Sequence, residues 1–167
     1  MKSIIGVDPG VNGGMVMMAF NGEVEDVYSF SGQTVDEVVA RMGEMSEYIK
    51  NQKEIIPRGV KGRVYLEKVT YIKGDGGMGA FTFGKVFGGL LFGFKALGMD
   101  VILVPPVLWQ SRLECMTGGN KNVTWNKAKE IWPTVFSGQT KGWGLSVADA
   151  LLIAEYGRQQ AVRELNG

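Results

Sequence analysis

Histidine is absent from the 167-residue chain, and cysteine occurs once, at Cys115. These two features exclude histidine-ligated zinc, Ser-His-Asp and Cys-His catalysis, and an intrachain disulfide framework. Any proton or metal chemistry would rest mainly on Asp, Glu and Lys. Oxygen ligands alone suit Mg²⁺ or Mn²⁺.

The chain also lacks a strong excess of either charge, with a formal net charge of +1. Overall charge therefore does not indicate a nucleic-acid partner, and a basic binding surface would have to be local. The apolar content of 45% over 167 residues predicts one domain, residues 1–167, with a substantial core.

No signal-peptide pattern precedes the first apolar run. The most apolar helix candidate, residues 86–94, lies between Lys85 and Lys95 and is shorter than the roughly 20 residues of a membrane span. We expect a soluble, cytoplasmic protein (in the host cytoplasm if it is encoded by a phage) without a membrane partner.

Alternating and β-branched apolar runs predict five strands, at residues 4–8, 15–18, 23–30, 63–67 and 100–104. Helical patterns cover residues 35–50, 80–97, 105–113, 123–132 and 146–164. Three strands in succession, followed by strands that alternate with helices, predict an α/β fold: a mixed five-stranded sheet flanked by helices.

Two of these helices have distinctive sequences. The first begins with a capping box, Thr34 to Glu37, and carries apolar residues at 35, 38, 39, 42, 45 and 49 on one face. The second contains Gly84, Gly88, Gly89 and Gly93. Each glycine costs up to about 1 kcal/mol in a helix interior, so we expect another backbone to pack closely against this helix.

Three acids occur where a layered α/β fold could bring them together. Asp8 and Glu67 end predicted strands, and Asp149 lies near the start of the last helix. Each also has a structural interpretation: a turn cap for Asp8, a solvated strand end for Glu67, and a capping box from Ser146 for Asp149. Taken singly, these interpretations are at least as favoured as a functional role.

Taken together, three motifs resemble the RuvC family of Holliday junction resolvases, most closely its short branch in bacteriophages, poxviruses and mitochondria. The motifs are Ile5-Gly6-Val7-Asp8-Pro9-Gly10, Tyr65-Leu66-Glu67-Lys68-Val69 and Ala148-Asp149-Ala150-Leu151-Leu152-Ile153-Ala154. The likeness spans nearly the whole chain. The first motif also resembles the phosphate loops of actin-like ATPases, and the third is much more specific.

The resemblance implies an RNase H-like fold in which acids hold two Mg²⁺ ions for in-line phosphodiester hydrolysis, with Mn²⁺ as a substitute. It assigns Asp8, Glu67 and Asp149 as the catalytic metal ligands. The family usually has a further acid or a histidine where this chain has Ser146, which is a weak, neutral candidate ligand. This difference leaves open a weakened site, recruitment of Asp75 or Glu155, or a natural or engineered change.

The resemblance also implies a homodimer that binds branched DNA such as four-way junctions and forks, with the glycine-rich helix at the dimer interface. Tyr71 and Phe81 are candidates for insertion into the junction centre, although a core role is favoured for each. Candidate DNA contacts, some of which would only solvate the surface, are Lys68, Tyr71, Lys73, Lys85, Arg112, Lys121, Lys127, Lys129 and Lys141.

The leading hypothesis is a Mg²⁺-dependent endonuclease that resolves branched DNA by paired phosphodiester hydrolysis. A looser nuclease that cuts forks or flaps, and a non-catalytic branched-DNA-binding dimer, are the alternatives. An actin-like nucleotide-binding protein is disfavoured because that fold needs a second phosphate loop, which the sequence does not contain.

Overall fold

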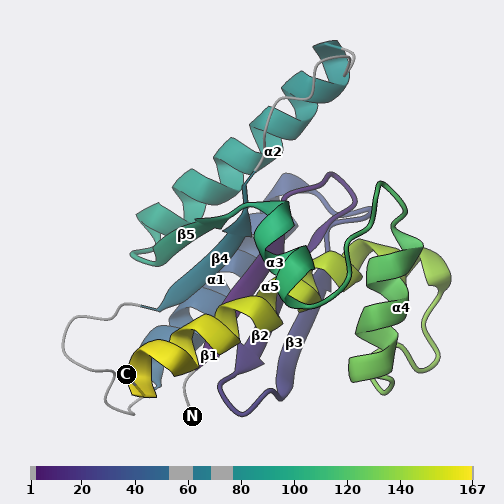
Figure 1. Ribbon diagram of the computed structural model, residues 1–167. Coiled ribbons are helices and arrows are strands. Elements are labelled where there is room, and N and C mark those ends of the chain that lie inside the picture. Colours follow the sequence, from purple (N-terminus) through teal and green to yellow (C-terminus); the bar gives the residue numbers. More distant parts are fainter. Residues whose placement is uncertain (1–2, 53–61, 69–76, 167) are drawn as a thin grey trace.

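A mixed five-stranded sheet forms the middle layer of the computed structural model, which describes residues 3–52, 62–68 and 77–166 (Figure 1). The strand order is β3-β2-β1-β4-β5, in which β1, β2 and β3 are antiparallel and β1, β4 and β5 are parallel. This arrangement confirms the predicted fold class. The strands are β1 (Ser3–Asp8), β2 (Gly14–Ala19), β3 (Val24–Ser29), β4 (Arg63–Glu67) and β5 (Asp100–Val104).

Helices cover both faces of the sheet (Figure 1). They are α1 (Val35–Asn51), α2 (Gly77–Ala96), α3 (Pro106–Arg112), α4 (Asn122–Ile131) and α5 (Lys141–Asn166). Because side chains alternate along a strand, β1 contributes Ile4 to a core shared with α5, and Ile5 and Val7 to a core shared with α1 and α2.

Helix α5 lies directly against β1, and Gly6 is the reason. A Cβ atom at Gly6 would lie 2.3 Å from the Ala154 backbone nitrogen and 2.5 Å from the Ala150 carbonyl oxygen. This approach is possible only because glycine lacks a side chain. It brings the apolar part of the third motif onto the strand that ends at Asp8.

The last helix starts earlier than predicted. Helix α5 begins at Lys141, not at Ser146, so Ser146 is not its N-cap. Gly142 and Gly144 favoured a loop in the sequence, but Gly144 has a packing role. A Cβ atom there would lie 2.6 Å from Trp125 Nε1.

The predicted capping box of α1 is confirmed. Glu37 N–H donates to Thr34 Oγ1 at 3.3 Å, and Thr34 N–H donates to Glu37 Oε2 at 2.7 Å. The predicted apolar face is only partly correct. Val35 and Val39 are exposed, whereas the residues that α1 buries are Met42, Met45, Ser46 and Ile49.

Helix α2 is largely uncovered, and its N-terminal half stands clear of the sheet layers (Figure 1). It buries Leu90 and Phe94. The expectation of a close backbone is wrong within the described residues of one chain: a Cβ atom at Gly84, Gly88 or Gly89 would meet none of them within 4 Å. Only at Gly93 would it meet a neighbour, Met42 Cε at 2.6 Å.

Helix α2 is also longer than expected, at 20 residues. It is, within the described residues, the helix long and apolar enough to cross a membrane by length and composition. Its mean hydropathy is 1.2 over a window of which 11% is buried. Met78, Phe81 and Phe92 on this helix are exposed, so the core role favoured for Phe81 is wrong within one chain.

Candidate active site

Asp8 and Glu67 end two neighbouring parallel strands on the same face of the sheet. Strands β1 and β4 pair with Val7 opposite Leu66, so Asp8 and Glu67 each follow a paired residue. Gly6, two residues before Asp8, packs against α5, and Tyr65, two residues before Glu67, belongs to the α5-side core. By alternation, both carboxylates face the layer that carries Asp149.

Asp8 is buried, with 4% of its surface exposed. Its Oδ1 atom accepts a hydrogen bond from the Gly10 N–H at 3.0 Å, which confirms the turn-capping interpretation for one oxygen. The other oxygen, Oδ2, is buried and has no hydrogen-bond partner within the described residues. A turn cap therefore accounts for only half of this carboxylate.

Asp149 lies within α5, well past the helix start, so the capping-box interpretation is excluded. Its Oδ1 atom is buried and, in the part of the chain that the structure describes, has no hydrogen-bond partner. Its Oδ2 atom lies 3.9 Å from Lys121 Nζ, just before α4. This lysine is 65% exposed, so the ion pair is open to solvent on one side.

Glu67 is half-buried, and a tryptophan holds one of its oxygens. Trp109 Nε1 donates a hydrogen bond to Glu67 Oε1 at 3.0 Å, and the indole itself is fully buried. Trp109 lies on α3, which follows β5 at the sheet edge where β4 ends. Sequence reasoning missed this residue because a tryptophan in an apolar helix carries no signal for a polar partner.

The three acids repel one another and are poorly solvated. Burial, together with the charges of Asp8 and Asp149, raises the pKa of Glu67 to about 8, although the Trp109 N–H and Lys121 act in the opposite direction. Burial and the Asp149 charge raise the pKa of Asp8. Burial also raises the pKa of Asp149, against the effects of Thr124 and Lys121. A cation among these groups would reverse this repulsion.

Cys115 is buried close to this site. Burial and the Asp149 charge raise the pKa of its thiol to about 11, with Lys127 opposing the shift. The nucleophilic form of cysteine is the thiolate. Cys115 is therefore protonated at neutral pH and is unsuited to act as a nucleophile.

Ser146 is buried one helical turn before Asp149, and protein atoms already occupy its hydroxyl. Oγ donates to the Trp143 carbonyl oxygen at 2.6 Å and shares a hydrogen bond of 2.7 Å with Ser29 Oγ. Of the two acids considered as replacements, Glu155 pairs with Arg158 at 2.6 Å, and Asp75 lies outside the described residues. The hydroxyl of Ser146 is thus directed towards the end of β3.

The donor set fits a hard divalent cation by its chemistry. Asp8 and Asp149 each have a buried oxygen without a hydrogen-bond partner in the part of the chain that the structure describes, and all three acids have raised pKa values. Within residues 3–52, 62–68 and 77–166, however, no three acidic or cysteine side chains lie close enough together to hold one ion. The arrangement therefore resembles an open carboxylate site more than a closed structural cage.

Two solved structures of RuvC from Thermus thermophilus share this arrangement of strands and helices. One, in complex with a Holliday junction substrate, has a TM-score of 0.57 and 17% sequence identity over 96% of this chain and 98% of that chain. The other has a TM-score of 0.56 and 18% identity over 95% of this chain and 97% of that chain. The chain has the RuvC fold. No protein-family model and no curated protein matches the sequence.

In this RuvC fold, several predicted DNA-contacting residues gather around α4. Lys129 Nζ and Lys141 Nζ lie 4.4 Å and 5.0 Å from the centre of the Trp125 ring, which places two cations on one indole. Lys121 is next to Asp149, and Lys127 is near enough to Cys115 to affect its pKa. These basic residues adjoin the acidic site.

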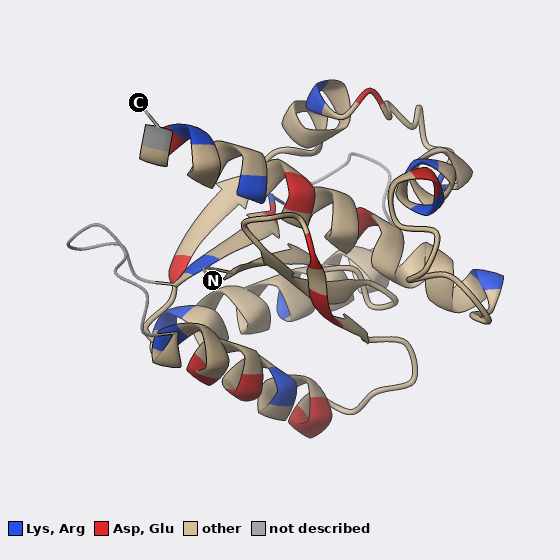
Figure 2. Cartoon of the chain, turned by 90° about the horizontal axis from the view of Figure 1, so that it is seen from below, with Lys and Arg blue, Asp and Glu red and all other residues tan. Residues whose placement is uncertain are grey.

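The other predicted contacts are more dispersed. Lys68 is exposed immediately after Glu67, Lys85 is exposed on α2, and Arg112 Nε donates to Gln159 Oε1 at 3.3 Å. Tyr71 and Lys73 lie outside the described residues. Over the described chain as a whole, positive and negative residues are interspersed, as Figure 2 shows. The basic group around α4 is a local feature.

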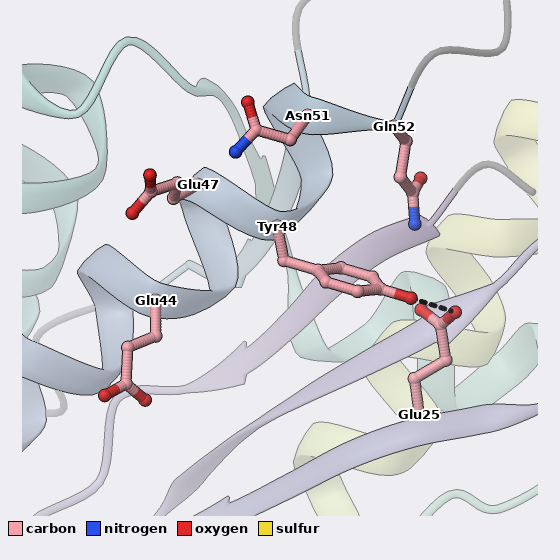
Figure 3. Close-up of a pocket in the computed structure, with 6 residues that line it drawn as sticks. All are labelled: Glu25, Glu44, Glu47, Tyr48, Asn51 and Gln52. Carbon is pink, nitrogen blue, oxygen red and sulfur yellow. Dashed lines mark hydrogen bonds between the residues drawn. The ribbon is translucent and has the colours of Figure 1, made fainter.

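A hollow of about 610 Å³ lies elsewhere, between α1 and β3, and contains none of the predicted site residues (Figure 3). Tyr48 in this hollow donates a hydrogen bond to Glu25 at 3.3 Å. Its remaining lining residues are Glu44, Glu47, Asn51 and Gln52. Three acidic side chains make it a poor surface for a polyanion.

Proposed function

We propose that the protein is a metal-dependent endonuclease that cuts branched DNA, including four-way junctions and forks. The observation that carries this proposal is the convergence of Asp8, Glu67 and Asp149 from three elements. Asp8 and Asp149 each have a buried oxygen without a hydrogen-bond partner among the described residues. The RuvC fold supports it, because one RuvC with this fold is in complex with a Holliday junction substrate.

Asp8, Glu67 and Asp149 would hold the Mg²⁺ ions, with Mn²⁺ as a substitute. A pair of such ions supplies activation of the attacking water and stabilisation of the leaving oxygen. The raised pKa values mean that these carboxylates are costly as charges in the metal-free protein. Their ionised form is favoured once a cation is bound.

Lys121 balances part of this negative charge, because its ammonium lies 3.9 Å from Asp149. Lys68, which is exposed immediately after Glu67, would meet a DNA strand at the acids. The group formed by Lys127, Lys129 and Lys141 around α4 would hold phosphates of the same strand. Lys85 and Arg112 would contact more distant arms of a branched substrate.

We also propose that the protein is a homodimer through α2. Gly84, Gly88 and Gly89 leave open space on this helix, and Met78, Phe81 and Phe92 are 81%, 68% and 73% exposed. A second copy of α2 would fill that space and cover the aromatic rings. Such a dimer would present two sites, as paired cleavage of a junction requires.

Sedimentation at micromolar concentration tests the dimer. A dimeric wild type that becomes monomeric or insoluble when Gly88 or Gly89 is replaced by Leu supports it. A strictly monomeric wild type contradicts it. Flotation with liposomes distinguishes a membrane partner, because a lipid-bound protein would float with the vesicles.

Cleavage of a four-way junction, a fork and linear duplex, each with Mg²⁺ and with EDTA, tests the nuclease. Asp8→Asn, Glu67→Gln and Asp149→Asn should each abolish nicking and leave junction binding largely intact. Asp36→Asn and Glu47→Gln, which change exposed acids on α1, are matched controls and should cut normally. Junction binding without cleavage by the wild type would instead indicate a non-catalytic branched-DNA-binding protein.

The same substrates decide between a resolvase and a looser nuclease. Paired, symmetric nicks in the four-way junction are expected of a dimer with two sites. Preferential cutting of the fork, without paired nicks in the junction, would indicate a fork- or flap-cutting enzyme. Wild-type cleavage by any one of the three acid variants would remove that residue from the site.

A further inference from the structure

Trp109 has a polar role that its apolar surroundings conceal. The residue is 0% exposed and lies on α3 in the core between the sheet and α5. Its indole nitrogen has one hydrogen and can only donate. The indole N–H donates to Glu67 Oε1, with 3.0 Å between nitrogen and oxygen. Glu67 lies at the end of β4, the strand that pairs in parallel with β5.

The backbone brings the two residues together. Lys68 N–H donates to the Val104 carbonyl oxygen at 2.8 Å, which joins the residue after Glu67 to the end of β5. Pro105 and Pro106 then start α3, and Leu113 and Cys115, which follow this helix, belong to the same buried core as Trp109. The position of the indole is thus determined by the sheet edge and by core packing, and the Glu67 carboxylate responds to it.

Burial alone explains why the indole needs a partner, but not why the partner is a carboxylate. Backbone carbonyl groups would satisfy the N–H without placing an ionisable group in the core. Among the hydrogen bonds of the described residues, this is the one made by a Glu67 side-chain oxygen. This hydrogen bond therefore restrains the rotation of the Glu67 side chain, and it does not involve Oε2.

We propose that Trp109 is the positioning residue of Glu67: its indole N–H holds Oε1 so that Oε2 is presented to a divalent cation. This inference rests on the proposed metal-dependent function and adds a residue to it. Partners of metal-ligating side chains commonly change metal affinity by about ten- to a hundredfold when removed. We expect a loss of that size for Mn²⁺ when the indole N–H is removed.

The test uses the full-length protein and Mn²⁺ binding measured by calorimetry, with no DNA present. Trp109→Phe keeps an aromatic ring but removes the donor. Trp132→Phe is the matched control, because Trp132 packs against the same core at its edge and makes no side-chain hydrogen bond in the described structure. Trp109→Phe should bind Mn²⁺ about ten- to a hundredfold more weakly than wild type, and Trp132→Phe should be unchanged.

A double-mutant cycle separates positioning from general loss of packing. In a Glu67→Gln background the ligand that Trp109 positions is already missing, so Trp109→Phe should cause little further loss of Mn²⁺ affinity. An equal loss in both backgrounds would overturn the proposal, because it would reflect altered packing. An unchanged Trp109→Phe affinity in a protein that binds Mn²⁺ would also overturn it, and would leave the nuclease proposal intact.

A second measurement does not depend on the folding of the Trp109 variant. In metal-free wild type, the Trp109 indole N–H resonance should be slow to exchange and should move when Glu67 is replaced by Ala. A resonance insensitive to Glu67→Ala would overturn the proposal. A wild type that neither binds Mn²⁺ nor cuts any branched substrate would overturn the proposed function itself, and the role of Trp109 with it.

Discussion

Replacing Glu67 by Gln should stabilise the metal-free protein at alkaline pH while it removes activity. The pKa of Glu67 is raised from 4.5 to about 8 by burial and by the charges of Asp8 and Asp149. An acid with a raised pKa in the folded state contributes stability below pH 4.5 that is lost as the pH rises through 8. Gln has no proton to lose, and its amide oxygen can still accept the Trp109 N–H.

The size of the effect follows from the difference between the two pKa values. Each pKa unit corresponds to about 1.4 kcal/mol, so the raised pKa of Glu67 would lower the stability of the fold by at most about 3 kcal/mol at pH 7 and about 5 kcal/mol at pH 9. Between pH 4.5 and pH 8, wild-type stability should fall by up to about 1.4 kcal/mol per pH unit from this group, and above pH 8 it should level off. Asp8 and Asp149 act with the same sign.

Urea unfolding between pH 5 and pH 9 in EDTA measures this directly. Glu67→Gln should be more stable than wild type, by an amount that grows with pH, whereas Glu47→Gln on the exposed face of α1 should follow the wild type. Mg²⁺ at 100 times its Kd should narrow this difference in stability, because bound ligand adds about 2.7 kcal/mol to the protein that binds it. A Glu67→Gln protein no more stable than wild type at pH 9 in EDTA would refute the electrostatic argument.

Three further predictions address other parts of the fold. Ser146→Asp would place a buried carboxylate beside the Ser29 hydroxyl and the Trp143 carbonyl oxygen, so it should destabilise the EDTA-treated protein. A lower Mg²⁺ concentration for half-maximal cleavage would show that this position faces the ions, and an unchanged requirement would show that it does not. Glu114 has a positive φ of 56°, and Glu114→Gly should raise the free energy of unfolding by about 0.5–1 kcal/mol in urea titrations, unless the turn after α3 relaxes. Gly6→Ala should give unfolded or insoluble protein, because its Cβ would lie 2.3 Å from the Ala154 nitrogen; a folded variant of normal stability would contradict the packing of α5 on β1.

The sheet could be predicted from sequence because its signals are local. Residues 63–67 and 100–104 alternate or branch as strands do, and both agree with the observed bounds of β4 and β5. The start of α5 could not be predicted from the sequence, because Gly142 and Gly144 are typical of loops. The packing of Trp125 that makes Gly144 necessary depends on a helix some twenty residues earlier in the chain.

The candidate site, like the fold, could be predicted from the sequence only in part. Asp8 and Glu67 each lie two residues after a residue that faces α5, namely Gly6 and Tyr65. Their shared face therefore follows from the alternation of side chains once β1 and β4 are neighbours. The contacts of Ser146 with Ser29 and Trp143, and of Trp109 with Glu67, join residues distant in sequence or hidden among apolar neighbours. No periodicity reports such contacts, because periodicity describes faces and not partners.

The loss of folding stability caused by the three buried carboxylates is itself an argument for a ligand. A structural role for Asp8 would be complete with the Gly10 N–H, yet its second oxygen is buried and has no hydrogen-bond partner among the described residues. The same is true of one oxygen of Asp149, and the pKa of Glu67 is raised by both neighbours. Amides at these positions would avoid the repulsion and keep the Gly10 and Trp109 hydrogen bonds. Carboxylates that destabilise the metal-free fold are better explained by a cation that binds only the folded state, because its binding energy then offsets their repulsion.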